Sequence, residues 1–286
     1  MRENADVPKS VVARTFKVAR ASLYTTTDRQ ATKDKLLLAE ILEVLAEFPS
    51  WGHRLIALFI GRHRHPVLRV MKKYGLSARR KRKHRKKAAD TGNPPSGIPN
   101  RIGRRCDAWL PNLIWVGDFT EWKWHGIRIF LATVMDQCTR QIVGWAIGRH
   151  HTANLVLQAL EDAKKRRSGI TPHIFHSDQG TEYRSEAVRE WLFNNDVLPS
   201  HSAKASPGDN PHKESFFGRF KSGIDFNNCS TYEDCLVLIH HGIFTYNTRR
   251  PHTALKMTPQ RFYEARMRLI RENGLQNPRK HPRNSV

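Results

Sequence analysis

Three acidic residues occupy positions from which their carboxylates could converge. Asp118 lies inside the apolar run IWVGDFTEW, Asp178 follows the apolar run HIFHS, and Glu214 stands near the start of a helical pattern. Phosphoryl transfer on nucleic acid uses two divalent cations about 3.5–4 Å apart, and Mg²⁺ prefers carboxylate oxygens. Because a carboxylate inside an apolar strand is costly to bury without a cation, this pattern indicates a metal site.

The spacing of these acids leaves a structural interpretation open. The chain has 26 acidic residues, which offer many triplets. Asp178 could cap a helix, and Glu214 could be an ordinary acid in a first helical turn.

The elements that would position the acids follow a recognisable order. Alternating and apolar runs predict strands over 113–124, 127–137 and 140–148 as an antiparallel meander. A helix is then expected over 152–166, a strand over 173–178, a helix over 185–195, a strand over 199–204 and a helix from Pro211 onward. This is the order of the ribonuclease-H-like α/β fold, with a mixed five-stranded sheet.

The region before the predicted sheet looks all-helical. Residues 11–27 could form a helix, a turn and a second helix, and residues 34–48 and 52–76 also show helical spacing. Ser22 and Tyr24 would read DNA if this region is a helix-turn-helix. A small helical module that packs on the core or on a partner is the alternative.

The charge balance points to a polyanionic partner. The chain carries 49 basic and 26 acidic residues, a net charge of +23, and nucleic acid is the commonest ligand of such chains. The densest basic run is expected to be a solvated hinge, an arm along DNA phosphates, or both. It comprises Arg79, Arg80, Lys81, Arg82, Lys83, Arg85, Lys86 and Lys87.

Composition suggests four regions. They are a helical region with a basic arm (1–90), a Pro/Gly linker (91–107), a catalytic core (108–270) and a basic tail (271–286). The four cysteines form no CxxC pair, so reduced structural thiols are expected rather than a zinc site. No apolar run approaches the roughly 20 residues of a membrane span. A cytoplasmic, nucleoid-associated protein follows.

Several ordered motifs resemble those of bacterial insertion-sequence transposases. WVGDFTEW, HSDQGTEY and SPGDNPHKESFFGRFK surround the three acids, with 35 residues between Asp178 and Glu214. YNTRRPHTALKMTPQRFY lies near the C-terminus, and the helical segment from Pro49 to Leu76 also fits. Over residues 8–264 the chain looks most like the IS-three family, in the protein made from the second reading frame (OrfB-type).

The resemblance implies a retroviral-integrase-like core with a DDE triad of Asp118, Asp178 and Glu214. These residues would hold Mg²⁺ or Mn²⁺, two ions per site. Water would free a 3′-OH at a transposon end, and this 3′-OH would attack a second phosphodiester. The implied partners are double-stranded DNA (terminal inverted repeats and target), further copies of the chain, and an upstream-frame (OrfA-type) protein or fusion. No membrane partner is implied.

Residues around the triad have two interpretations each. Lys221 follows Glu214 by two helical turns and would contact a phosphate rather than solvent. Arg249, Arg250 and His252 form a basic patch that we expect beside DNA. His176 could orient the site or be structural, and Asn210 could cap a helix or touch DNA.

Other nearby residues are expected to be structural. Asp136 is expected to be a turn residue. Four tryptophans are expected to lie in or near the core: Trp115, Trp122, Trp145 and Trp191. Glu182, where the family usually has Gln, could crowd the metal site or face solvent, and we expect it to face solvent.

Two other functions compete with an active transposase. A DNA-binding repressor or architectural protein would not need the intact triad. A ribonuclease H or general nuclease would share the fold but would not require specific terminal DNA.

Overall fold

The computed structural model describes residues 8–20, 22–78, 97–103, 108–202 and 211–274. For residues 9, 22–28, 211–214 and 222 it describes the helix but not the side chain. The chain forms two compact units, Met1–Arg80 and Lys81–Val286. The predicted basic arm and much of the linker lie outside the described residues, so the predicted region bounds stay predictions.

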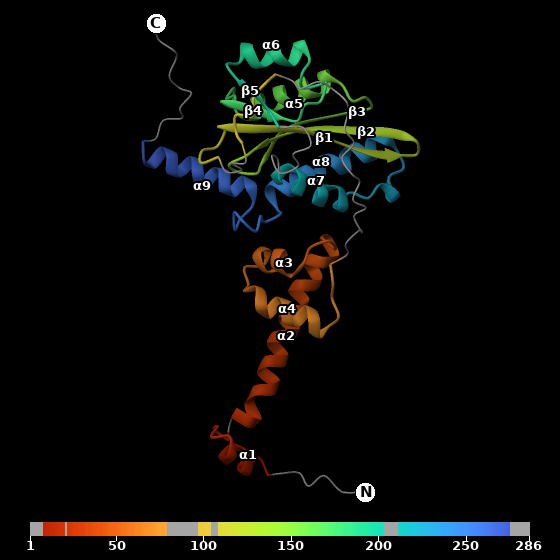
Figure 1. Cartoon of the computed structure of the whole chain (residues 1–286). Helices are drawn as coiled ribbons and strands as arrows, with labels where there is room; N and C mark the ends of the chain where they lie inside the picture. The colour runs from red at the N-terminus through yellow and green to blue at the C-terminus, as the bar shows by residue number, and fades with distance from the viewer. Residues whose placement is uncertain (1–7, 21, 79–96, 104–107, 203–210, 275–286) are drawn as a thin grey trace. The chain divides into compact units, whose positions relative to one another are not determined.

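The first unit is helical, as predicted (Figure 1). Its helices are α1 (Lys9–Thr15), α2 (Ser22–Glu47), α3 (His53–Phe59) and α4 (Arg64–Lys73). Residues 34–48 do not form a separate helix, because α2 runs unbroken through them. The pattern over 52–76 is broken instead, at Gly61 with φ of +68°, a conformation that glycine adopts without strain.

An apolar cluster and a buried carboxylate hold this unit together. The cluster comprises Ile41, Val44, Trp51, Ile56, Ala57, Val67, Val70 and Met71. Asp34 on α2 is only 2% exposed, and its carboxylate accepts from the Arg69 guanidinium at 2.5 and 2.8 Å and from Lys73 at 3.0 Å. These hydrogen bonds hold the pKa of Asp34 well below its usual range. They also tie α2 to α4.

The second unit is built on a mixed sheet of five strands in the order β3-β2-β1-β4-β5. The strands are β1 (Ile114–Trp124), β2 (Ile127–Asp136), β3 (Ile142–Gly148), β4 (Ile174–Ser177) and β5 (Leu198–His201). β1, β2 and β3 pair antiparallel, whereas β1 with β4 and β4 with β5 pair parallel. The predicted mixed five-stranded sheet, with its first three strands antiparallel, is confirmed.

Helices cover both faces of this sheet (Figure 1). On one face lie α5 (Ala153–Arg166) and α6 (Glu186–Asn194), which share an apolar cluster with Trp115, Val134 and Phe175. On the other face lie α7 (Pro211–Gly223) and α8 (Tyr232–Thr248), which pack on β2 and β3. The helix α9 (Pro259–Glu272) follows.

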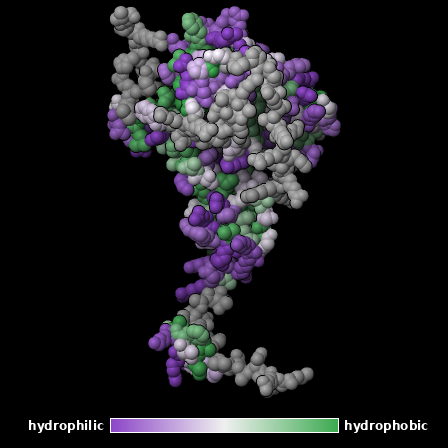
Figure 2. All heavy atoms as spheres, viewed as in Figure 1, coloured by the Kyte–Doolittle hydropathy of each residue, from purple (hydrophilic) through white to green (hydrophobic). Residues whose placement is uncertain are grey.

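The last two helices were not predicted, although their first residues carry a signal. Thr231 and Asp234 form a capping box at the start of α8, with hydrogen bonds of 3.1 and 2.8 Å. Thr258 caps α9, and Pro259 occupies its first turn, both typical of helix starts. Figure 2 shows hydrophilic residues over much of the visible surface of the described chain.

The structure confirms the structural interpretation of Asp136 and of the tryptophans. The buried Asp136 carboxylate accepts from the backbone N–H groups of Asn112, Cys138 and Thr139 at 2.7, 2.8 and 3.2 Å, and thus shapes the turn after β2. The tryptophans Trp115 and Trp191 are buried, and Trp122 and Trp145 pack against the second core cluster.

Replacing Gly144 by Ala tests how closely α5 lies against β3. A Cβ at Gly144 would collide with the carbonyl oxygen of Ala159 and lie 2.5 Å from the amide nitrogen of Ala163. Since both are backbone atoms, α5 must shift, and we expect a loss of about 3 kcal/mol in the free energy of unfolding. Gly148→Ala on the same strand is the control, because its Cβ would lie 3.1 Å from the flexible Leu155 side chain and no closer than 4.0 Å to a backbone atom, the carbonyl oxygen of His150. Urea denaturation followed by circular dichroism measures both; equal losses would contradict the packing.

Replacing Asp34 by Asn tests the ion pairs of the first unit. The folded pKa of Asp34 lies below its unfolded value, so its stabilisation is present above the unfolded pKa and is lost as pH falls through the folded pKa. We therefore expect Asp34→Asn to lower the melting temperature at pH 7, and the difference from wild type to shrink below about pH 3. A difference that is independent of pH would contradict this account.

Candidate active site

Asp118 and Asp178 lie side by side because β1 and β4 pair in parallel. The register joins Val116 to His176, and each aspartate lies two residues further along its chain. Adjacent strands are about 4.8 Å apart, and residues two apart share a face. The two aspartates, with 59 residues between them in sequence, are thus neighbours at one edge of the β1–β4 pair.

Backbone amides orient both carboxylates. Asp118 Oδ1 accepts from the N–H of Phe119 at 2.7 Å, and Asp178 Oδ1 accepts from the N–H of Gly180 at 3.0 Å. The Thr133 hydroxyl, directly opposite on β2, donates to the Asp118 carbonyl at 3.4 Å. These contacts fix where the two side chains point.

The pKa of the buried Tyr183 reflects the negative charge of the nearby carboxylates. Burial raises the pKa of Tyr183 well above its ordinary value. The negative charges of Asp118, Asp178 and Glu182 raise this pKa further. Tyr183 is 4% exposed, so little water lies between its side chain and the three carboxylates to screen their charge. A concentration of acid in a chain of net charge +23 favours a cationic ligand.

Glu182 does not face solvent, contrary to our expectation. Its side chain is 14% exposed, and its Oε1 lies 3.0 Å from Nδ1 of His151. A Cβ on Gly180 would lie 2.6 Å from Glu182 Oε2 and 3.1 Å from Asp178 Oδ1, so both oxygens border the same small space. The extra acid therefore lies beside Asp178 and is partly buried, a placement that follows from the Gly180 turn.

The bare backbone of Gly117 allows aromatic rings to lie against β1 immediately before Asp118. A Cβ at Gly117 would collide with Cζ of Phe175 and lie 2.9 Å from Cε1 of Tyr183. His176 is fully buried, and its Nδ1 lies 2.9 Å from the Ser200 hydroxyl, which ties β4 to β5. His176 thus has a structural contact on the strand that carries Asp178.

The third predicted acid lies on α7, which covers the face of the sheet toward which Asp118 points. Residues Trp122 and Leu131, which flank Asp118 and Thr133 on that face, belong to the cluster that includes α7. The Glu214 side chain lies outside the described part. Among the side chains that the structure does describe, no three His, Cys, Asp or Glu groups come together as a metal site.

The donor set suits a hard divalent cation. Asp118 and Asp178 offer carboxylate oxygens, the ligands that Mg²⁺ prefers, and backbone N–H groups already orient them. The N-terminal turn of α7 would add Glu214 as a third carboxylate. With these three residues the site could hold divalent cations at a phosphodiester.

The predicted DNA-contacting residues lie in three places. Lys221 on α7 donates to the Glu121 carbonyl at 2.6 Å and lies 5.5 Å above the Trp122 ring. Arg249, Arg250 and His252 follow the end of α8. Asn210 and the basic arm from Arg79 to Lys87 lie outside the described residues, and the side chains of Ser22 and Tyr24 are likewise not described.

Models of the integrase core domain match residues 110–207 and 195–259 of the chain. The simian T-cell lymphotropic virus intasome, solved by cryo-electron microscopy in complex with PP2A regulatory subunit B56 gamma, aligns with a TM-score of 0.50 and 18% identity. The alignment covers 85% of this chain and 77% of that chain. The predicted ribonuclease-H-like, integrase-type fold is therefore confirmed.

Two curated relatives are transposases by name. The probable transposase of the element IS1353 from Shigella flexneri is 32% identical over 84% of this chain. The chain spans about half of that relative, 49% of its length. The putative transposase InsK of IS150 from Escherichia coli K12 is 30% identical over 73% of this chain and 76% of the relative. This chain therefore belongs to the insertion-sequence transposases that carry an integrase core domain, consistent with an OrfB-type protein of the IS-three family.

Proposed function

We propose that the chain is a DNA transposase that cuts at the ends of an insertion sequence and joins the freed ends to target DNA. The observation that carries this proposal is the parallel pairing of β1 with β4, which ends two residues before Asp118 and Asp178, in a chain of the transposase family. Its large positive charge fits double-stranded DNA as the substrate. The carboxylate pair distinguishes this function from that of a DNA-binding repressor.

Asp118, Asp178 and Glu214 would hold Mg²⁺ or Mn²⁺, two ions per site. Such ions, when bound, neutralise the charge that develops on the reacting phosphate and its attacking and leaving oxygens. The residues of the chain itself contribute by holding the carboxylates in a fixed orientation. The amides of Phe119 and Gly180 fix two of the carboxylates, so the phosphodiester would meet a preformed set of ligands.

Two displacements at phosphorus follow from this arrangement. In the first, a water oxygen bonds to phosphorus, and the bond to the 3′ oxygen breaks, leaving a 3′-hydroxyl and a 5′-phosphate. In the second, that 3′-hydroxyl bonds to a target phosphorus, and the target's own 3′ oxygen leaves. In the first displacement one proton of the water passes to the leaving 3′ oxygen, and the phosphodiester becomes a phosphate monoester. In the second, the proton of the attacking 3′-hydroxyl passes to the leaving 3′ oxygen, and one phosphodiester replaces another. Neither displacement needs a covalent bond to the protein.

We also propose the partners of this chain, which are further copies of itself and an upstream-frame protein. Joining two ends requires more than one copy of the chain in the active complex. An upstream-frame protein or fusion would supply further end recognition. None of the described helices has the length and apolarity needed to cross a membrane, and a cytoplasmic place at the nucleoid is proposed from the DNA substrate.

Removing any of the three carboxylates is expected to abolish catalysis without abolishing DNA binding. The variants are Asp118→Asn, Asp178→Asn and Glu214→Gln, assayed for Mg²⁺- or Mn²⁺-dependent cleavage and joining of labelled DNA that carries the element's ends. We expect each rate to fall at least about 10³-fold, roughly 4 kcal/mol in the activation barrier.

The matched control is Glu121→Gln, an exposed acid on the same strand as Asp118. It should cleave and join at the wild-type rate. Full activity of any triad variant would refute the site. A wild-type chain that binds DNA but never cuts it, with or without an upstream-frame protein, would favour the repressor, and cutting without a need for specific ends would favour a general nuclease.

Neutralising the basic arm is expected to weaken DNA binding and its dependence on salt. Each phosphate contact adds about 0.9 to the slope of log affinity against log salt. The quadruple variant with Gln at Arg82, Lys83, Arg85 and Lys86 should therefore lower this slope by about 3–4, as measured by fluorescence anisotropy between 50 and 200 mM KCl. A control that exchanges Arg and Lys at the same four positions should keep the slope. An unchanged slope in the Gln variant would show that the arm does not contact phosphates.

A further inference from the structure

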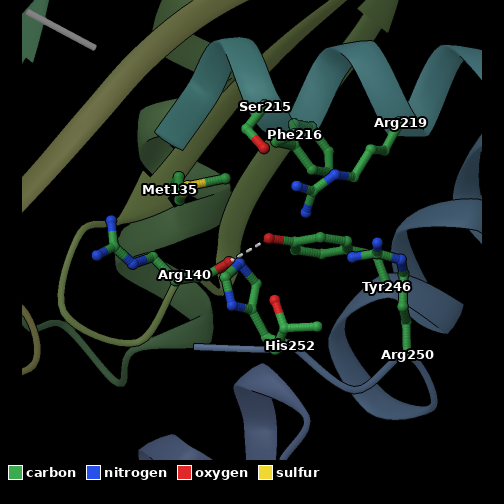
Figure 3. A pocket seen from close by; sticks show the side chains of 9 residues that line it. Met135, Arg140, Ser215, Phe216, Arg219, Tyr246, Arg250 and His252 are labelled. Atoms are coloured by element: carbon green, nitrogen blue, oxygen red, sulfur yellow. Dashed lines mark hydrogen bonds between the residues drawn. The ribbon is translucent and has the colours of Figure 1, made fainter. Parts of the chain in front are cut away.

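A small pocket lies between the β2–β3 turn, α7 and the segment after α8 (Figure 3). Its volume is about 70 Å³. Its walls include Arg140 from the turn, Ser215 and Arg219 from α7, and Arg250 and His252 from the end of α8 and beyond. Neither Asp118 nor Asp178 lines it, so it is separate from the described carboxylates.

The pocket gathers positive charge. The guanidinium groups of Arg219, from α7, and of Arg250, from the segment after α8, lie near the Tyr246 ring on one side of the pocket, whereas the Arg140 guanidinium points away from it (Figure 3). Burial lowers the pKa of Arg250, and the nearby charge of Arg219 lowers it further. The described residues that line the pocket include no acid. Cations that converge in this way favour an anionic ligand.

A half-buried histidine in the same wall, His252, has a hydrogen-bonding atom without a partner among the described residues. Burial lowers the pKa of His252 to about 4, and the charges of Arg250, Arg140 and Arg219 contribute to the lowering. Its imidazole is therefore neutral near pH 7. Among the described residues, the buried Nδ1 of His252 has no hydrogen-bond partner. A ligand oxygen in the pocket could supply one.

The walls of the pocket are fixed by contacts of their own. The Tyr246 hydroxyl donates to the Arg140 carbonyl at 3.0 Å (Figure 3), and its ring packs edge-on against Phe216 with centroids 4.7 Å apart. The His252 amide donates to the Met257 carbonyl at 2.8 Å. These contacts hold the backbone of Arg140 and His252 and the ring of Tyr246 in place, so little of the wall has to be ordered when a small anion binds.

The pocket adjoins the proposed reaction site. Ser215 directly follows Glu214 on α7, and Arg219 is one helical turn further. Met135, also in the wall, lies on β2 two residues from Thr133, which pairs with Asp118. Two residues along a strand span about 7 Å. A group in this pocket would therefore lie close to the carboxylates on the same face of the sheet.

We propose that this pocket binds one phosphate group of the DNA backbone and thereby positions the strand on the carboxylates. Guanidinium groups bind phosphate through paired N–H donors, and the Ser215 hydroxyl and His252 Nδ1 would complete the set. The assignment rests on the proposed DNA substrate. It adds Arg219 to the predicted basic patch, and makes Arg219, Arg250 and His252 parts of a single site.

The first test follows the His252 ring by nuclear magnetic resonance in the full chain with ¹³C-labelled histidine, the signal being assigned with His252→Gln. An anion beside the ring offsets the repulsion from the arginines, so the pKa of His252 should rise by about one pH unit or more when a 30-base-pair duplex is added. Inorganic phosphate is the second probe. A rise with phosphate but not with DNA would make this a site for the free ion and overturn the DNA assignment. No rise with either would overturn the pocket.

The second test compares Arg219→Gln and Arg250→Gln with Arg189→Gln, a control on the exposed side of α6. Arg219 is exposed enough for its loss to leave the fold intact, which circular dichroism verifies. Both pocket variants should bind the duplex about tenfold more weakly, with a salt slope lower by about 1, and the control should match wild type. Pocket variants that bind like the control would refute the proposal. Because binding is measured without catalysis, a chain that never cuts DNA would leave this result standing.

Discussion

The parallel pairing of β1 with β4 is the constraint on which the site depends. The two strands share three registered residue pairs, which end at Val116 and His176, two residues before Asp118 and Asp178. A slip of one residue would turn one carboxylate to the opposite face. The contact between His176 and Ser200 holds β4 against β5, and the absence of a side chain at Gly117 lets Phe175 and Tyr183 pack beside β1.

The two faces of the sheet have different roles. On one face α5 and α6 bury a tight apolar cluster, and α5 lies so close to β3 that Gly144 leaves no room for a Cβ. On the other face α7 and α8 bury a second cluster and leave the basic pocket between their ends. Because the helices on the first face are tightly packed, the sheet is a firm support for the second face. On that second face the acidic side chains and the basic pocket lie within a few residues of each other. Opposite charges so near to one another suit a ligand that is a polyanion with bound cations.

The sequence predicts the parts of this arrangement that depend on local pattern. Alternation and apolar runs place all five strands, and the placement of Asp118 and Asp178 follows once the ribonuclease-H-like order is recognised. Tyr183 and Arg219 stand five residues after Asp178 and Glu214, so the sequence places them near the acids. It does not show that Tyr183 is buried beside both aspartates or that Arg219 lines a pocket with Arg250. The prediction that Glu182 faces solvent was wrong because its partner, His151, belongs to another segment of the chain. The continuous α2 depends on residues before Asp34 that show no clear apolar stripe.

The central claim is that Asp118 and Asp178 share a divalent cation. The most direct measurement is anomalous X-ray scattering from crystals of the full chain soaked in Mn²⁺, which replaces Mg²⁺ at oxygen sites. The account predicts an anomalous peak about 2.0–2.2 Å from carboxylate oxygens of both aspartates, with Glu214 close by. A peak elsewhere, or none in this place at millimolar Mn²⁺, would contradict it.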